Sequence, residues 1–256
     1  MIATADLGRR VGVGVVLATV AIAALWLGGV ALWALASLVA LIGLAEWGAL
    51  VGAGRLRTAV ALAVLAAALI CALPMLWDTD RSSVAALLIT ALLLALVPGA
   101  AGVAFGAGYV GTAAIGLMFL REQPHGVLLA LWTLAIVWAT DIGAFFAGRA
   151  IGGARLAPAI SPNKTWAGLA GGVVAATLVG WIVARVGNLP PATLMLGAPL
   201  AVLAQVGDLF ESWLKRRRGL KDSGRLLPGH GGVLDRIDGM LPVTILVAAL
   251  VANGSL

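Results

Sequence analysis

A succession of long apolar runs, separated by short polar segments, constrains this chain more than any other feature. Apolar residues make up 62% of the chain and charged residues only 11%, whereas soluble domains carry about 25% charged residues. A helix that crosses a bilayer needs about 20 apolar residues. The sequence therefore predicts an all-α, polytopic transmembrane helical bundle of about nine spans. These spans are expected near 11–27, 29–45, 58–76, 84–97, 100–120, 126–146, 166–186, 192–210 and 239–253.

The runs leave little chain for an extramembrane domain, so we expect one continuous membrane domain. It would consist of N-terminal transmembrane helices in 1–120 and a C-terminal catalytic region in 121–256. The single cysteine, Cys71, excludes a disulfide within one chain. The 34 glycines allow close contact between helices and leave a homodimer open. The net charge of +6 is read as a sign of topology rather than of nucleic-acid binding.

Basic residues lie mainly in alternate connections between the predicted spans. With nine spans, the N-terminus and the segments 46–57, 147–165 and 211–238 share one side of the membrane and carry 14 of the 17 Lys and Arg residues. Cytoplasmic segments are enriched in Lys and Arg. The pattern predicts a multi-pass membrane protein with its N-terminus and active site in the cytoplasm. The compact form and a composition rich in Ala, Gly, Leu, Val and Arg suit a bacterial inner membrane.

Charge is concentrated in residues 141–238, which hold 17 of the 28 charged side chains. An ionisable side chain at membrane depth is costly and needs a partner or a task. Asp141 and Asp208 each lie near the cytoplasmic end of a predicted span and precede a basic stretch. We therefore expect them to face one cavity.

The segment 207–239 contains two acidic patterns that suit a metal-phosphate site. If the helix continues past Asp208, one polar face carries Asp208, Glu211, Ser212 and Lys215. Asp235 and Asp238 repeat the three-residue spacing at the start of the last span. Carboxylates of this kind bind Mg²⁺ together with substrate phosphates. The glycines of the 228–232 loop would let its backbone approach a ligand closely.

A second polar stretch, Ser161-Pro162-Asn163-Lys164-Thr165, stands just before an apolar helix. It groups hydroxyls, an amide and an ammonium, and Thr165 can cap a helix N-terminus that attracts anions. We interpret it as a phosphate site. It is not a P-loop, because the G-x-x-x-x-G-K-[ST] pattern is absent.

The polar positions of 212–238 together resemble the signature of the phosphatidate cytidylyltransferase family, whose members are also called CDP-diacylglycerol synthases. The matching positions are Ser212, Lys215-Arg216, Lys221-Asp222, Pro228-Gly229-His230-Gly231-Gly232 and Asp235-Arg236-x-Asp238. Residues 141–149 and 161–166 also look like family motifs, and they depart from the pattern at Asn163, where Lys is common. The resemblance is detailed over about 100 C-terminal residues; the N-terminal half is similar only as a hydrophobic bundle.

The resemblance implies transfer of cytidylate from CTP to phosphatidate, giving CDP-diacylglycerol and pyrophosphate for phospholipid biosynthesis, with Mg²⁺ required and a second cation left open. Both substrates and membrane lipid would be its partners, with no nucleic acid. The expected catalytic residues are Asp208, Lys215, Lys221, Asp222, Asp235, Arg236 and Asp238. The expected substrate-binding residues are Asp141, Ser161, Asn163, Lys164, Thr165, Ser212, Arg216, His230, Gly231 and Gly232. The expected metal ligands are Asp208, Asp235 and Asp238.

Other functions stay open at this point. A transporter of an anionic solute would suit the number of spans, but it predicts charges near mid-membrane and internal repeats. A nucleotidyl- or phosphotransferase acting on another lipid phosphate would use a similar site. A CDP-alcohol phosphotransferase is excluded because its D-G-x-x-A-R motif is missing. His230 either binds a phosphate oxygen or shapes its loop.

Overall fold

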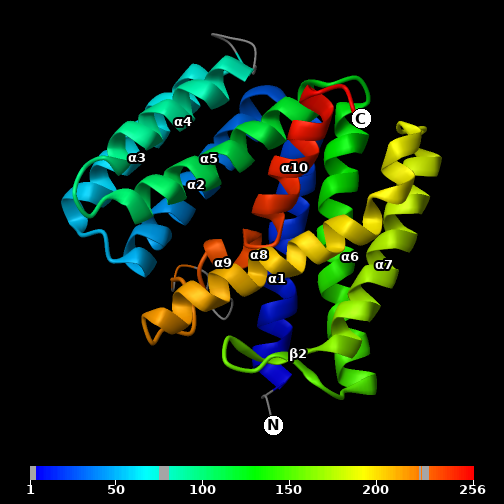
Figure 1. The fold of residues 1–256 in the computed structure, drawn as a ribbon. Coiled ribbons are helices and arrows are strands. Elements are labelled where there is room, and N and C mark those ends of the chain that lie inside the picture. Colours follow the sequence, from blue (N-terminus) through cyan, green and yellow to red (C-terminus); the bar gives the residue numbers. More distant parts are fainter. Residues whose placement is uncertain (1–3, 75–80, 225, 227–230) are drawn as a thin grey trace. The chain divides into compact units, whose positions relative to one another are not determined.

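The computed structural model describes residues 4–74, 81–224, 226 and 231–256, and the described part of the chain is predominantly helical (Figure 1). This confirms the helical prediction. The helices are α1 (Thr4–Leu27), α2 (Gly29–Val51), α3 (Arg55–Cys71), α4 (Arg81–Ala95), α5 (Ala101–Glu122), α6 (Gly126–Ile151), α7 (Trp166–Val186), the 3-10 helix η1 (Pro191–Met195), α8 (Gly197–Arg217), α9 (Leu234–Ile237) and α10 (Met240–Ala252). Two strands, β1 (Arg155–Ala157) and β2 (Ser161–Thr165), form an antiparallel hairpin.

Among the residues that the structure describes, four helices, α2, α5, α6 and α7, are long and apolar enough to cross a membrane. Shorter apolar helices cover Gly12–Leu27, Val84–Ala95 and Met240–Ala252. These lengths and compositions identify an integral membrane protein. The total of nine spans stays a prediction.

The chain forms two compact units. The first unit contains residues 1–118 and 222–236, and the second contains 119–221 and 237–256. The described residues of 222–236, which carry part of the polar signature, therefore belong to the same unit as the N-terminal helices.

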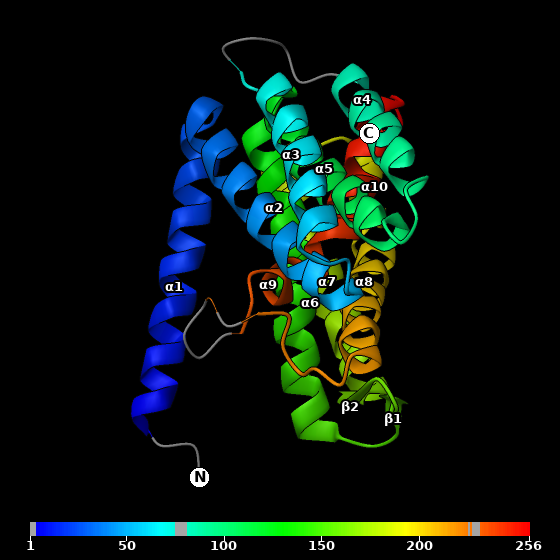
Figure 2. The ribbon, with the colours of Figure 1, turned by 90° about the vertical axis from the view of Figure 1, so that its left-hand side faces the viewer.

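In the first unit, tryptophans fix the packing of α2 against α3 and α5. Trp47 is 2% exposed, and its Nε1 donates a hydrogen bond of 2.9 Å to the carbonyl oxygen of Gly102. Its ring also packs against Phe105 and Tyr109 of α5. Trp33 Nε1 donates a bond of 2.7 Å to Leu69 at the end of α3. Figure 2 shows α3 lying between α2 and α4 in this unit, as their contacts require.

In the second unit, α6 and α7 lie side by side along most of their length (Figure 1). Small residues allow this approach, since a Cβ on Gly172 would lie 2.8 Å from the carbonyl oxygen of Thr140. Trp132 is buried in the core, and its Nε1 donates a bond of 3.0 Å to Gly180. Residues of α8 and α10 such as Leu200 and Val243 complete this core.

The structure differs from the sequence prediction at several boundaries. The connection 147–165 is not a simple loop, because α6 runs on to Ile151 and the β1–β2 hairpin follows. The second apolar run does not end at residue 45, because α2 continues to Val51 and takes in Glu46. The last helix begins at Met240, after Asp235 and Asp238, since α9 ends at Ile237 and a turn intervenes. At Pro98-Gly99 the structure agrees with the predicted division between the spans 84–97 and 100–120, because these residues form a turn between α4 and α5.

Candidate active site

The polar stripe on α8 confirms the predicted continuation of this helix past Asp208. Ser212 Oγ donates a hydrogen bond of 3.3 Å to Asp208 Oδ1, one turn away. Lys215 Nζ lies 3.2 Å from Glu211 Oε1 in an ion pair of the same spacing. Glu211, Ser212 and Lys215 are all buried. Buried charges need partners inside the protein. Here the buried charges of Glu211 and Lys215 are each other's partners.

Strand β2 brings a cation to Asp208. Lys164 Nζ lies 2.6 Å from Asp208 Oδ2 and donates a bond of 2.9 Å to Gln205 Oε1. Gln205 is buried one turn before Asp208 on α8. The amide therefore helps to aim the Lys164 ammonium, which is the predicted phosphate-binding cation, at the predicted metal ligand.

Thr165 caps α7, as its position in the sequence predicts. Its Oγ1 accepts a bond of 3.0 Å from the Gly168 amide, and its backbone is extended. Gly168 lies against α6 at this point, since its Cβ would be 3.0 Å from the carbonyl oxygen of Ala144. The cap fixes the junction between the hairpin and α7, and so fixes Lys164 next to it.

These groups line a cavity of about 590 Å³ in the second unit. Asp141, on α6, joins Asp208 on its wall, which confirms that the two carboxylates face one cavity. The lining residues are Asp141, Ala144, Phe145, Gly148, Arg149, Asn163, Lys164, Thr165, Gly168, Leu169, Gln205 and Asp208. The cavity thus combines both signs of charge with the apolar surface of α6 and α7.

Arg216 holds the hairpin turn near the end of α8. Its Nε donates a bond of 3.2 Å to the carbonyl oxygen of Ile160, which directly precedes Ser161. A second guanidinium nitrogen donates a bond of 2.9 Å to the carbonyl oxygen of Leu220. In this structure the Arg216 guanidinium therefore bonds backbone carbonyls that flank two of the predicted motifs.

Asp238 lies in the turn before α10, and the charges of Asp208, Asp141 and Lys215 affect its pKa. Its pKa is raised to about 8, first by burial and then by the negative charge of Asp208 and of Asp141. The Gly239 amide, which donates a bond of 2.7 Å to Asp238 Oδ1, and the ammonium of Lys215 act in the opposite direction. The charges of Asp208 and Asp141 therefore act on the carboxyl group of Asp238 within the second unit.

The carboxylate donors of the second unit have the chemistry that Mg²⁺ prefers. Mg²⁺ binds oxygen ligands, and it commonly takes one or two protein carboxylates plus phosphates and water. Asp208 and Asp238 carry oxygen atoms of this kind, and the negative charge of Asp208 raises the pKa of Asp238. Within the described ranges, no group of three or more His, Cys, Asp or Glu side chains is close enough to hold a metal ion alone. The site fits a cation that is shared with substrate phosphates.

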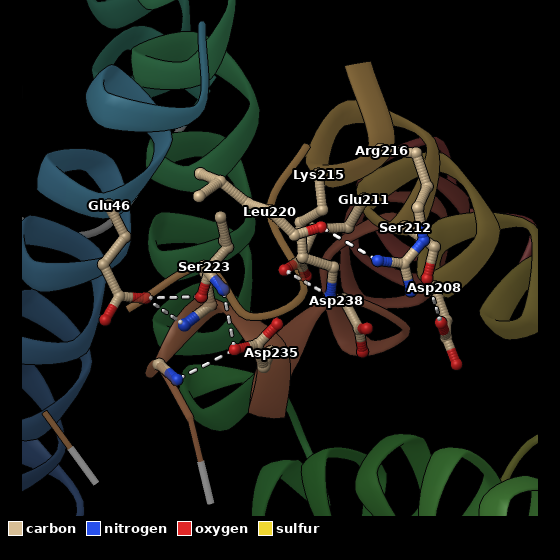
Figure 3. Close-up of polar contacts among 12 residues, drawn as sticks. Glu46, Asp208, Glu211, Ser212, Lys215, Arg216, Leu220, Ser223, Asp235 and Asp238 are labelled. Carbon is tan, nitrogen blue, oxygen red and sulfur yellow. Dashed lines mark hydrogen bonds and ion pairs between the residues drawn. The ribbon is translucent and has the colours of Figure 1, made fainter. Parts of the chain in front are cut away.

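The first unit places Asp235 in a different setting (Figure 3). Asp235 Oδ2 accepts hydrogen bonds of 2.9 Å from the Ser223 amide and 2.8 Å from the Gly232 amide. Gly231 adopts a positive φ of 81° and turns the chain directly in front of this carboxylate. Asp235 is thereby fixed by the backbone of the segment that carries it.

The other predicted site residues of 221–236 differ in their exposure. Lys221, Asp222 and Arg236 are exposed, and Gly232 is buried. His230, like Pro228 and Gly229, lies outside the described residues.

Comparison with known protein families decides what this arrangement belongs to. The model of the cytidylyltransferase family matches residues 8–253, which is nearly the whole chain. The chain belongs to the cytidylyltransferase family. The resemblance detected in the C-terminal motifs therefore extends through the N-terminal helices as well.

Individual members of the cytidylyltransferase family give the same result. A phosphatidate cytidylyltransferase of Brucella suis is 49% identical over 147 residues, which are 56% of this chain and 54% of that protein. The phosphatidate cytidylyltransferase of Bacillus subtilis is 44% identical over 131 residues, 50% of this chain and 49% of that protein. That of Haemophilus influenzae is 40% identical over 129 residues, 48% of this chain and 45% of that protein. The match thus spans about half the length of each of these relatives.

The polar residues at these sites that were not among the predicted site residues include Gln205, Ser223, Arg149 and Glu46. Arg149 lines the cavity from the last turn of α6. Glu46 of α2 bonds to residues of the segment 222–236 (Figure 3). The signal for Glu46 was present in the sequence, since an acidic residue at the end of an apolar run needs a partner. The sequence prediction placed Glu46 in the connection 46–57 rather than in a helix, so its need for a partner was not recognised.

Proposed function

We propose that this member of the cytidylyltransferase family transfers a cytidylyl group from CTP to phosphatidate. An oxygen of the phosphatidate phosphate forms a bond to the α-phosphorus of CTP. The bond between that phosphorus and the oxygen bridging to the β-phosphorus breaks, and pyrophosphate leaves with the electron pair. The products are CDP-diacylglycerol and pyrophosphate, and no covalent intermediate with the protein is needed.

The observation that carries this proposal is the cavity that Lys164 and Arg149 share with Asp141 and Asp208. A triphosphate needs cations, and its metal needs carboxylates, within reach of one another. Here two carboxylates and two cationic side chains line the same cavity. The cavity lies beside apolar helices, where a lipid phosphate can reach these groups. The family membership and the names of the relatives point to the same reaction.

Mg²⁺ is the proposed cofactor, and a second cation is left open. Asp208, Asp235 and Asp238 stay its proposed protein ligands; because the described residues hold no group of three such side chains that could bind a metal alone, substrate phosphates would complete the coordination. Asp235 and Asp238 are three residues apart in sequence, so one short segment can carry both. When bound, the ion neutralises phosphate charge and draws electron density from the reacting phosphorus.

The protein's own part in the reaction is to position the substrates and to balance charge. Lys164 is held in place by Gln205 and Asp208 and can turn its third N–H donor to a phosphate. Lys215, Lys221 and Arg236 are the further cations proposed to bind the triphosphate and the lipid phosphate. Charge that develops on the leaving pyrophosphate is stabilised by such pre-positioned cations. The hydrogen-bonding groups proposed to assist them are Ser161, Asn163, Thr165, Ser212 and Arg216.

We also propose that the active site and the N-terminus face the cytoplasm, with the protein in a bacterial inner membrane. The support is the asymmetry of 14 basic residues against 3 between alternate connections. CTP would then enter from the cytosol, and phosphatidate from the adjoining leaflet.

The test uses purified protein in mixed micelles with phosphatidate, cytidine-labelled CTP and Mg²⁺. Label in the lipid phase and released pyrophosphate are measured together. Wild type is expected to produce both in equal amounts and only with phosphatidate. Asp235→Asn is expected to lower the rate by about 1,000-fold, since a charged ligand becomes neutral. Arg185→Gln, on the exposed last turn of α7, is the matched control and should keep the wild-type rate.

The alternative functions predict different results in the same assay. Consumption of CTP with another lipid phosphate, but not with phosphatidate, would identify a different acceptor. Folded protein that neither binds nor consumes CTP would refute the proposed reaction. Uptake of an anionic solute by vesicles containing the protein would then be measured.

A further inference from the structure

Glu46 stands out because it is the one charged residue of α2, a helix that is otherwise apolar. Its carboxylate is surrounded by hydrogen-bond donors from a distant part of the sequence. Oε1 accepts a bond of 3.1 Å from the Val233 amide, and Oε2 accepts one of 2.8 Å from the Leu234 amide. Ser223 Oγ donates a third bond of 2.9 Å to Oε2 (Figure 3). The three donors lie at least 177 positions away along the chain.

Two glycines of the segment 212–238 that carries the family signature, Gly224 and Gly232, leave room for the Glu46 carboxylate. A Cβ on Gly224 would collide with Glu46 Oε1. A Cβ on Gly232 would collide with both Glu46 Oε2 and Ser223 Oγ. The sequence suggested that the glycines of 228–232 admit a ligand. At Gly232, the group that is admitted is Glu46 of the same protein.

Ser223 links Glu46 to Asp235. Its hydroxyl bonds to Glu46 and its amide bonds to Asp235 Oδ2. The Gly232 amide also bonds to Asp235 Oδ2, and the next two amides, Val233 and Leu234, bond to Glu46. The carboxylates of Glu46 and Asp235 therefore bind the amides of the same short stretch of backbone. The position of Asp235 depends on the conformation of that stretch.

The position of Glu46 is itself fixed. The next residue, Trp47, is buried and bonds through Nε1 to the Gly102 carbonyl oxygen of α5. Gly106 of α5 leaves space for the Trp47 ring, because a Cβ there would collide with it. The carboxylate thus stands on a helix that cannot turn without breaking this contact.

We propose that Glu46 is a positioning residue, which holds Ser223 and the backbone of residues 232–235 in the conformation that presents Asp235 to the metal and the phosphates. The role rests on the proposed function, because Asp235 is assigned to the metal only there. A carboxylate suits the task because every group that faces it in these bonds is a donor. Glutamine keeps the shape but has one acceptor oxygen, and its amide would meet backbone N–H groups. Loosening of the segment should therefore follow from Glu46→Gln.

The first measurement is the Mg²⁺ concentration that gives half-maximal rate in the micelle assay. For Glu46→Gln we expect it to rise by about tenfold, because Asp235 is no longer held in place. A general loss of folded protein lowers the rate but leaves this concentration unchanged. Ser223→Ala removes one of the three bonds and should give a smaller rise in the same direction. Ser37→Ala, a buried change elsewhere on α2, is the matched control and should give the wild-type value.

The second measurement is amide hydrogen exchange in the intact protein without substrates, read at Ser223, Gly232, Val233 and Leu234. Faster exchange at these amides in Glu46→Gln, with wild-type exchange in α6 and α7, is expected because opening of the segment becomes easier. Unchanged exchange at the four amides, or an unchanged Mg²⁺ requirement in an active variant, would overturn the proposal. If the wild type makes no CDP-diacylglycerol, the proposed function fails, and the exchange alone decides whether Glu46 holds the segment.

Discussion

The two units hold their acidic residues in different ways. In the second unit, Asp208 is paired with side chains, the Lys164 ammonium and the Ser212 hydroxyl. In the first unit, Asp235 and Glu46 are paired mainly with backbone amides. Side chains can change partners by rotating, whereas amides move only when the chain itself moves.

This difference suggests a division of labour. The cavity of the second unit has groups that can be redistributed when a phosphate enters, because Lys164 has three donors and is only partly buried. The segment of the first unit has its geometry set before any ligand arrives, which is the form of pre-organisation that catalysis favours. The three predictions that follow test this contrast, from the largest effect to the smallest.

Lys164→Met removes the cation from the cavity but keeps most of the length of the side chain. We expect kcat/KM for CTP to fall by about 100-fold, close to 2.7 kcal/mol of transition-state stabilisation, since a charge-assisted contact to phosphate is lost. Lys164→Arg should lose less, because the charge remains. Arg185→Met removes a cation from the last turn of α7, where it stacks on Trp181, and is the matched control.

Steady-state kinetics with CTP as the varied substrate measure this effect. A wild-type kcat/KM in folded Lys164→Met would mean that the triphosphate does not use this cavity. The contrast between the side-chain pairs of the second unit and the backbone pairs of the first unit would then have no consequence for function.

Gly232→Ala tests the fixed side of the contrast. The new methyl group would collide with the Glu46 carboxylate and the Ser223 hydroxyl, and it would lie 2.6 Å from the backbone nitrogen of Gly224, which cannot rotate away. We expect a loss of about 2 kcal/mol in the free energy of unfolding, typical of overpacking at a tight site. Thermal unfolding in detergent gives the value. Gly12→Ala, at an open position of α1 with nothing within 4 Å, should cause no loss. Equal stability of the two variants would show that the segment yields easily.

Much of the second unit could be predicted from local sequence. The face shared by Asp208, Ser212 and Lys215 follows from helical periodicity, and the structure places it as expected. The cap at Thr165 follows from a hydroxyl residue that directly precedes an apolar helix. Both features depend on residues that are at most a few positions apart.

The arrangement of the first unit could not be predicted in the same way. The bonds from Ser223 and Leu234 to Glu46 span 177 and 188 positions, and no local period relates such residues. The extension of α2 beyond residue 45 was concealed because Glu46 interrupts the apolar run that defines the span. The hairpin of β1 and β2 was missed because its strands are too short to show alternation. In each case tertiary contacts, rather than local preference, decide the outcome.

Thr165→Ala gives the smallest effect and sharpens the contrast within a single cavity. Thr165 lines the cavity, yet its hydroxyl oxygen bonds to the Gly168 amide, as the carboxylates of the first unit bond to theirs. Loss of this cap should lower the free energy of unfolding by about 1 kcal/mol, while Thr165→Ser, which keeps the hydroxyl, should stay within a few tenths. Thermal unfolding and the micelle assay are measured on the same samples. If the Ala variant lost stability but kept kcat/KM, Thr165 would belong with the backbone-bonded groups that set geometry. A fall in kcat/KM of more than about tenfold at unchanged stability would instead place its hydroxyl among the groups that turn to the substrate.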